Sequence, residues 1–252
     1  GRRLRRPYIW DLNPFVSNID SLNIRYGNPD LGPEMTNTGE LGYTVLKGKT
    51  SISMRFIQAF NNRQIINYTS FDEQSGITSA LIANAGVNRA TTFVINLSTK
   101  VTKLWSLSAG ANGRYVRIRN RFDKSQDNHG VGGYLNINSS YQVTPQWSAS
   151  VSGFVSRPDV QLQGQSGYFR SYNASTSYKL FKNKITIAVS ANNFFTKYFS
   201  YISRSSDVNF KLYSENRNLQ RSVNMSVRWN FGKLSESVSR KRGINNDDLK
   251  AQ

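Results

Sequence analysis

The last part of the chain alternates strictly between apolar and polar side chains. From position 222 to 231 every second residue is apolar, and the residues between are serine, asparagine or arginine. The apolar set is Val223, Met225, Val227, Trp229 and Phe231. Successive side chains of a strand point to opposite faces of a sheet, so a period of two creates one apolar and one polar face. The segment is therefore predicted to be a β-strand rather than an amphipathic helix.

The same alternation recurs along the chain. It is clear at 105–115, 135–143, 147–155 and 185–191, and weaker at 41–45, 52–60, 93–97 and 168–180. With the last stretch, this makes about nine strands, and no helical spacing competes with them outside the tail. The fold is predicted to be all-β.

The polar face of these strands carries few charges. It consists of Ser, Asn, Thr, Gly and Gln with occasional Arg, whereas a soluble sandwich exposes many Lys and Glu side chains. Such a face suits a hydrated lumen, while the apolar face meets lipid. Rings lie near strand ends, as at Trp105, Trp147 and Trp229, where interfacial girdles occur. The pattern favours an antiparallel transmembrane β-barrel over a β-sandwich with these rings in its core.

Short and long connections alternate between the predicted strands. Short links lie at 47–48, 99–103, 144–146 and 182–183, and longer polar connections at 61–89, 120–130, 160–166 and 199–216. Outer-membrane barrels have short periplasmic turns and longer extracellular loops, so the last strand is expected to end in the periplasm. A two-residue turn at Lys47-Gly48 would place Glu40 opposite Arg55 as a lumenal ion pair.

The side-chain inventory argues against catalysis. The chain has no Cys and a single His, which removes disulfides, thiolate metal sites and a Cys nucleophile. We therefore predict no enzyme activity and no catalytic, cofactor-binding or metal-binding residues. His129 is expected to be an exposed loop residue.

The formal charge of +18 raises the question of an anionic partner. Nucleic acid is not expected, because the charge is spread along the chain and no recognisable nucleic-acid motif accompanies it. Four arginines rise along one strand into its loop: Arg114, Arg117, Arg119 and Arg121. They are candidates for an anionic ligand or for lipopolysaccharide phosphates, the alternative being a solvated basic loop. Tyr198 and Tyr201 are candidates for stacking on a ligand, or belong to a girdle or loop core.

About nine strands cannot close an antiparallel barrel with both ends correctly paired. An open edge in hydrocarbon would leave backbone groups without partners, so further strands are expected upstream. Residues 1–6 are expected to be the end of one such strand, leading into a long extracellular segment at 7–35, with the other strands starting at about 36.

Several motifs resemble a known family. They are Arg3-Leu-Arg-Arg-Pro7, Leu12-Asn-Pro-Phe15, Gly27-Asn-Pro-Asp-Leu-Gly-Pro-Glu34, Glu40-Leu-Gly-Tyr43, Arg228-Trp-Asn-Phe-Gly-Lys233 and Arg242-Gly-Ile-Asn-Asn-Asp-Asp-Leu249. Together they resemble the TonB-dependent outer-membrane receptors of Bacteroidetes-type bacteria, and more narrowly that group's outer-membrane β-barrel family. The resemblance covers essentially the whole chain.

The resemblance implies a 22-stranded barrel closed by an N-terminal plug. Residues 1–232 would supply its C-terminal portion, with about the last nine strands, and residues 233–252 a polar periplasmic tail. The implied function is energised uptake of a small nutrient of the siderophore, glycan or peptide class across the outer membrane. The implied partners are the lipid bilayer and lipopolysaccharide, the TonB complex acting through the plug, and a surface lipoprotein. The alternative is a structural or adhesive barrel without a transport cycle.

Overall fold

The computed structural model describes residues 1–20, 22–123 and 125–231, and the expected tail at 233–252 lies outside them. In this part of the chain, a twelve-stranded sheet is joined by a separate three-stranded sheet. The main path of the large sheet is β1 (Arg2–Arg5), β4 (Glu34–Lys47), β5 (Thr50–Phe71), β6 (Thr78–Lys100), β7 (Trp105–Asn120), β8 (Asp127–Gln142), β9 (Trp147–Arg157), β11 (Phe169–Leu180), β12 (Ile185–Asn192) and β15 (Ser222–Trp229).

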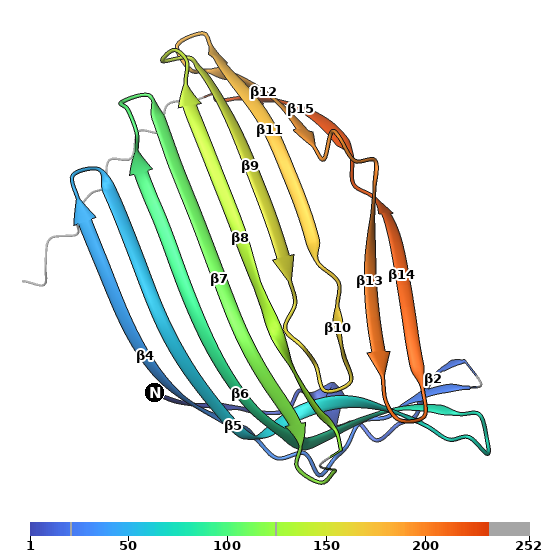
Figure 1. Ribbon diagram of the computed structural model, residues 1–252. Helices are drawn as coiled ribbons and strands as arrows, with labels where there is room; N and C mark the ends of the chain where they lie inside the picture. Colours follow the sequence, from blue (N-terminus) through green and yellow to red (C-terminus); the bar gives the residue numbers. More distant parts are fainter. Residues whose placement is uncertain (21, 124, 232–252) are drawn as a thin grey trace, which may run out of the picture.

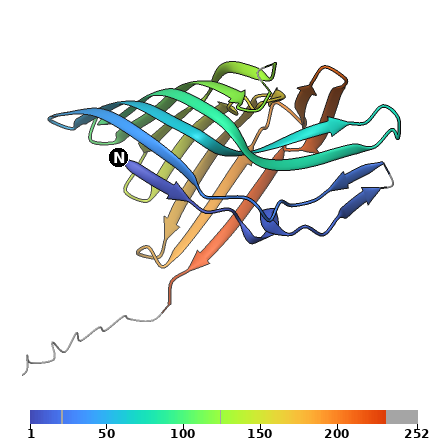
Figure 2. The same cartoon turned by 90° about the horizontal axis from the view of Figure 1, so that it is seen from below.

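Neighbouring strands of this path are antiparallel, and together they form a curved wall (Figure 1). Seen from the end, the wall bends round an open side and does not close on itself (Figure 2). Each alternating stretch of the sequence lies mainly within one of these strands, so the all-β prediction is confirmed. The short strand expected within residues 1–6 is also present, as β1 paired with β4.

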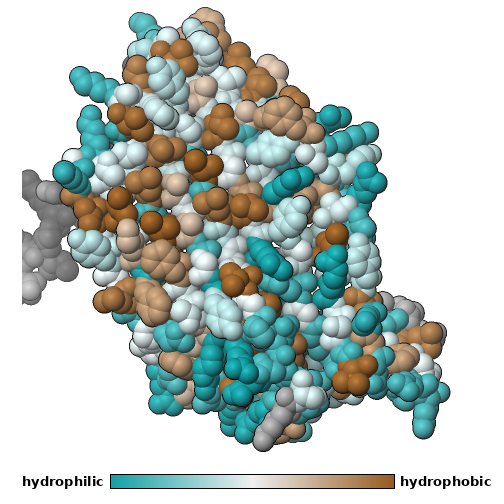
Figure 3. All heavy atoms as spheres, viewed as in Figure 1, coloured by the Kyte–Doolittle hydropathy of each residue, from teal (hydrophilic) through white to brown (hydrophobic). Residues whose placement is uncertain are grey.

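The two faces of the wall differ as the alternation predicts. Apolar side chains of one parity remain exposed, and Figure 3 shows them gathered over the middle and upper parts of the sheet. An exposed set of large rings lies toward the short-turn ends of five strands: Trp105, Tyr141, Trp147, Tyr178 and Trp229. The opposite face carries hydroxyls and amides, with Ser148 bonded to Ser177 at 2.8 Å and Ser150 to Ser175 at 2.7 Å. The apolar face is called outward below, and the polar face inward.

The connections from β4 to β5, β6 to β7, β8 to β9 and β11 to β12 are short and lie at one end of the wall (Figure 1), here called the short-turn end. At the other, long-loop end, two expected loops turn out to be strands. Residues 61–89 continue β5 and β6, and only 72–77 connect them. Register shifts between Asn61 and Ile66 interrupt the alternation there, which hid these strands from the sequence pattern.

Residues 199–216 are the second exception. They form the hairpin of β13 (Tyr198–Ser206) and β14 (Lys211–Leu219), which joins β10 (Gly164–Ser166) in the three-stranded sheet. β13 follows β12 along the chain and β14 precedes β15, so the hairpin continues the β12–β15 pair toward the long-loop end (Figure 1).

The register of the first hairpin differs from the prediction. β4 and β5 pair Lys47 with Thr50, so the turn is Gly48-Lys49 and Arg55 stands opposite Gly42, not Glu40. Gly48 has φ +58°, and a two-residue hairpin turn can take such a glycine at its first central position. Because the error is two residues, both side chains stay on the inward face, and Arg55 Nη1 still lies 3.5 Å from Glu40 Oε1 along the diagonal.

Residues 7–33 form a folded strap at the long-loop end. The strap contains α1 (Ile9–Leu12) and the hairpin of β2 (Ser17–Asp20) and β3 (Asn23–Arg25), and β3 runs parallel to β6. Asn84 holds the strap through its amide, which accepts from Gly32 N–H at 2.7 Å and donates to the Gly32 carbonyl at 2.9 Å. Across the described ranges, no helix has both the length and the apolar character needed to cross a bilayer.

Buried Glu34 then ties the first strands together. Its carboxylate pairs with Arg5 of β1 and accepts from Ile65 N–H of β5 at 2.9 Å. A buried carboxylate needs such partners, so β1, β4 and β5 are fixed to one another at this end.

Candidate functional site

The connection between β9 and β11 folds onto the inward face at the long-loop end. Val160 packs with Ala90 and Val116, and Leu162 packs with Ile66 and Ile118. These contacts bury both side chains, at 6% exposure each, on a wall that is otherwise largely open to solvent. Residues 158–166, the inward loop, are therefore held by apolar packing.

Two glycines of β8 make room for this loop. A Cβ atom at Gly130 would lie 2.6 Å from Val160 Cγ1, and one at Gly132 would overlap Asp159. A side chain at either position would push the loop off the wall. The glycines at these two positions thus have a packing reason, which the sequence pattern does not reveal.

Gln163 joins the inward loop to two other segments. Its Oε1 accepts from Thr69 N–H at 2.6 Å, and its Nε2 donates to the Thr69 carbonyl at 2.7 Å and to Asp207 Oδ2 at 2.6 Å. Asp207 Oδ2 also accepts from Gln126 Nε2 at 2.9 Å. One buried amide therefore connects the ends of β5 and β13 with the β7–β8 connection.

Arg114 lies on the inward face beneath the loop. Its Nη1 is 2.9 Å from Asp159 Oδ2, while its Nε is buried and has no hydrogen-bond partner among the described residues. The side chain borders a cavity of about 380 Å³ lined also by Asn67, Asn88 and Gln161. Arg114 therefore places a positively charged guanidinium, a group with several hydrogen-bond donors, beside this cavity.

A row of rings continues this surface along the inward face. Tyr134, Phe154, Phe169 and Phe199 follow one another with centroids 6.3, 6.2 and 5.4 Å apart. Phe199 is buried and the other three are at least partly accessible. The row offers aromatic surface to a ligand entering from the long-loop end.

The structure does not bring the four predicted arginines together. Burial alternates along β7, and Arg117 and Arg119 are exposed on the outward parity, opposite to Arg114. Arg121 lies past the strand, with its guanidinium 5.1 Å from the Phe122 ring. A single strand face cannot hold residues of both parities, so the four arginines do not share one face, and a ligand role for each of them stays a prediction.

Arg117 is engaged by a carboxylate. Its Nε donates to Asp127 Oδ1 and Oδ2 at 3.2 Å, and its Nη2 donates to Oδ2 at 2.5 Å. These hydrogen bonds hold the pKa of Asp127 below its ordinary value of 3.8, and the partial burial of the carboxylate opposes them.

The two predicted tyrosines also face opposite ways. Phe199 belongs to the inward row, so Tyr201 shares its side of β13 and Tyr198 points outward. The Tyr198 ring is covered by Arg217 at 4.7 Å and by Lys197 at 5.2 Å. Of this pair, Tyr201 alone remains a candidate for the inward site.

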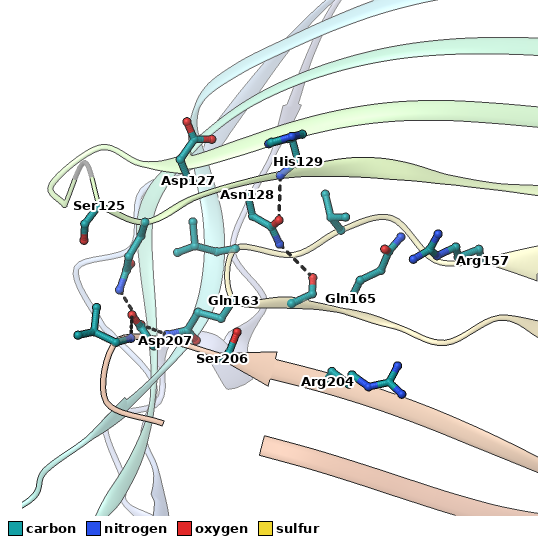
Figure 4. Close-up of a pocket in the computed structure, with 15 residues that line it drawn as sticks. Ser125, Asp127, Asn128, His129, Arg157, Gln163, Gln165, Arg204, Ser206 and Asp207 are labelled. Atoms are coloured by element: carbon teal, nitrogen blue, oxygen red, sulfur yellow. Dashed lines mark hydrogen bonds between the residues drawn. The ribbon is translucent and has the colours of Figure 1, made fainter. Parts of the chain in front are cut away.

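A second hollow of about 540 Å³ opens between β8, the inward loop and β13. Figure 4 shows Arg157 and Arg204 toward one end of it, and Asp207 and Ser125 toward the other. His129 lines the hollow from β8, exposed as expected but on a strand rather than in a loop, 6.3 Å from the Tyr115 ring. In residues 1–20, 22–123 and 125–231, no three His, Asp or Glu side chains gather closely enough to hold a metal ion.

The sequence pattern missed Gln163, Asp159 and the inward aromatic row. The alternation places Tyr134 and Phe154 on the polar face, where the other side chains are mostly serine and asparagine. These two rings on a polar face were the signal from which the row could have been predicted. Gln163 and Asp159 lie outside regular strands, and their roles depend on contacts with Thr69 and Arg114, far away along the chain.

Residues 1–229 match the outer membrane protein beta-barrel family. The chain belongs to this family. Its location is accordingly the cell outer membrane, where the outward face contacts the lipid bilayer.

Among solved structures, sixteen chains match, one being a protein described as the copper transporter OprC. The TM-score with OprC is 0.62 at 17% sequence identity, and the match covers 90% of this chain and 36% of that one. The chain thus spans about a third of that transporter's length, and the likeness concerns the fold. No curated protein sequence matches the chain.

Proposed function

We propose that this chain is the C-terminal part of the barrel of a TonB-dependent receptor, of the Bacteroidetes type, that imports a small nutrient. The observation that carries the proposal is that Arg114, the polar cavity beneath the inward loop and the aromatic row all lie on the inward face of the wall. A structural or adhesive barrel needs its binding groups on the exterior, where they contact other molecules of the cell surface. An importer needs its binding groups in the lumen, where the ligand enters.

The open sheet supports a longer barrel. β1 and β15 stand at the two ends of the main path, each with a strand neighbour on one side. In hydrocarbon these edges need further strands, and the partial coverage of OprC agrees with a wall that continues outside this chain. The proposal places the short-turn end and the tail at 233–252 in the periplasm, with residues 1–232 as barrel.

The energy of uptake would come from TonB acting on a plug domain, not from chemistry on this wall. We therefore propose no enzyme activity for the chain. Copper belongs to the description of OprC, and we infer no ligand of this chain from it. The ligand classes that the proposal includes are siderophores, glycans and peptides, and a surface lipoprotein is a proposed partner for the last two.

Growth of a deletion strain tests the uptake function. The strain would be grown with a ferric siderophore as sole iron source, an oligosaccharide mixture as sole carbon source, or a peptide digest as sole nitrogen source. We expect a defect on one of these media, reproduced by loss of TonB. Wild-type growth on all of them, combined with altered envelope integrity or adhesion, would instead support the structural barrel.

A substitution links uptake to the inward site. In the full-length protein, Arg114→Gln removes the unpartnered donor and the bond to Asp159. We expect an uptake loss of about tenfold or more on the medium identified, because a lost hydrogen bond to a charged group costs about 1.5–3 kcal/mol. Arg228→Gln on β15, inward but at the short-turn end, is the matched control. Equal uptake by both variants, at equal outer-membrane abundance, would remove Arg114 from the proposal.

A further inference from the structure

The hollow of about 540 Å³ faces outward, away from the lumen. Arg157 shares its parity on β9 with Trp147, a ring of the exposed outward set. On β13, Arg204 is five residues from inward Phe199 and so points to the opposite side. Both arginines line the hollow, and the inward loop forms its floor through Val160 and Leu162.

The hollow begins where the membrane-spanning part of the wall ends. Arg157 is ten positions from Trp147 along β9, and Arg170 is eight positions from Tyr178 along β11. A tilted strand needs about 9–11 residues to cross the hydrocarbon core. With the rings at one interface, these guanidiniums stand at the other, on the long-loop side that the proposed orientation makes extracellular.

Three guanidiniums at this level have no carboxylate partner. Arg170 stands opposite Val155 and is thus a diagonal neighbour of Arg157, while Arg204 shares the hollow with Arg157. Within the part of the chain that the structure describes, none of the three forms an ion pair. Arg157, Arg170 and Arg204 are called the outer arginine cluster below.

The carboxylates of the hollow are occupied elsewhere. Asp127 is bound by Arg117, and Asp207 accepts from Gln126, Gln163 and the Val208 N–H. Among the described residues, neither carboxylate forms an ion pair with the cluster, and Figure 4 shows Asp207 away from Arg157 and Arg204.

An apolar surface lies next to the cluster on the same face. Val155 precedes Arg157 by two residues, and Leu135 stands opposite Val155 with 51% of its surface exposed. Lipid-facing aliphatic side chains lie below, and the guanidiniums above them include Arg204, which lies 5.6 Å from the Tyr213 ring centroid but is not bound by a carboxylate in the described residues. This arrangement matches an amphiphile with acyl chains and an anionic head. A soluble anion would gain nothing from the aliphatic part of this surface.

We propose that the outer arginine cluster and its hollow bind the phosphorylated headgroup of a glycolipid in the outer leaflet. Arg157 and Arg204 donate to phosphate oxygens, and Arg170 adds charge at the rim of the hollow. Gln165 and Ser206, which also line the hollow, provide polar contacts for the sugar. The proposal rests on the proposed orientation but not on any transport activity.

Lipid binding by the full-length protein in detergent tests this site. Native mass spectrometry would measure binding of lipid A, of the same lipid after phosphatase treatment, and of inorganic phosphate. The variant is Arg157→Gln/Arg204→Gln, and the control Arg55→Gln/Arg228→Gln removes the same charge from the inward face. Circular dichroism would confirm that both retain the sheet.

We expect lipid A to bind the variant about tenfold or more weakly than wild type, because two charge-assisted hydrogen-bonding groups are lost. The control should bind like wild type, and phosphatase-treated lipid should bind weakly to all. Equal lipid A affinity of the variant and wild type would overturn the site. So would equal binding of the dephosphorylated lipid, or full displacement of lipid A by inorganic phosphate at the same concentration. None of these outcomes depends on nutrient uptake.

Discussion

Val160 of the inward loop packs directly over Gly130 of β8, where a Cβ atom would lie 2.6 Å from Val160 Cγ1. This contact predicts that Gly130→Leu displaces the inward loop from the wall, because the added side chain would overlap the position of Val160. Hydrogen–deuterium exchange of the full-length protein should show faster exchange at residues 158–166. The strands around the loop should keep their protection.

Gly113 offers a matched control for that experiment. It lies on the neighbouring strand β7, and a Cβ atom there would meet nothing within 4 Å. Gly113→Ala should leave the exchange of residues 158–166 unchanged. If Gly130→Leu also leaves it unchanged, the loop is not packed on β8 as described.

The Gln163 amide predicts coupling between separate loops. Gln163→Ala removes its bonds to Thr69 and Asp207, which are half-buried, so the loss should be at or below the lower end of about 1–3 kcal/mol per group. Exchange should therefore accelerate in residues 66–71 and 204–208 as well as in the loop itself. Gln161→Ala, two residues away and exposed, is the control and should change neither segment. An effect of Gln163→Ala restricted to its own loop would contradict the coupling.

The register of the first hairpin predicts which cysteine pairs crosslink. Glu40 stands opposite Ile57 and Gly42 opposite Arg55, so cysteines at 40 and 57, or at 42 and 55, should oxidise to disulfides. Directly opposed strand positions have the Cα separation that a disulfide requires, about 4.4–6.8 Å. Cysteines at 40 and 55 are diagonal and should crosslink poorly. Efficient crosslinking of that last pair would restore the register with its turn at Lys47-Gly48.

The Arg117–Asp127 pair predicts a small pH dependence. Because the guanidinium lowers the pKa of Asp127 in the folded state, the pair stabilises fully above the unfolded value of 3.8 and loses its effect as pH falls through the lower folded value. The melting temperatures of wild type and Arg117→Gln should thus differ at pH 7 and converge in strong acid. Arg119→Gln should show the same trend with a much smaller difference, because Arg119 lowers the pKa of Asp127 through its charge alone. A difference that persists below both pKa values would show that the pair is not its cause.

Strand positions followed from the sequence because lipid on one side and water on the other impose a period of two. The same period predicts that Glu40 and Arg55 share one face. This holds although the turn lies at Gly48-Lys49, one residue later than predicted. Gly48 determines the register, because the turn needs a positive φ at its first central position and Gly48 is the residue that adopts it. Register therefore required turn geometry in addition to periodicity.

The site was less accessible to prediction. The sequence shows arginines rising along β7, and the alternation of strand faces places Arg114 and Arg117 on opposite sides of the wall. The inward loop depends on Val160 and Leu162 meeting strands that are distant in sequence, and nothing within residues 158–166 specifies that direction. The loop contacts two glycines on β8 and Thr69 on β5. These contacts cannot be predicted before the strands are placed side by side in the wall.

Spin labelling of the last strand tests most directly whether this sheet is a membrane wall with a lipid face and a water face. The chain has no cysteine, so single cysteines at 222 to 227 can carry the label in the full-length protein in bilayers. Labels at 223, 225 and 227 should be relaxed mainly by oxygen dissolved in lipid, and labels at 222, 224 and 226 by a water-soluble nickel complex. The absence of this alternation, or its reversal, would contradict the account.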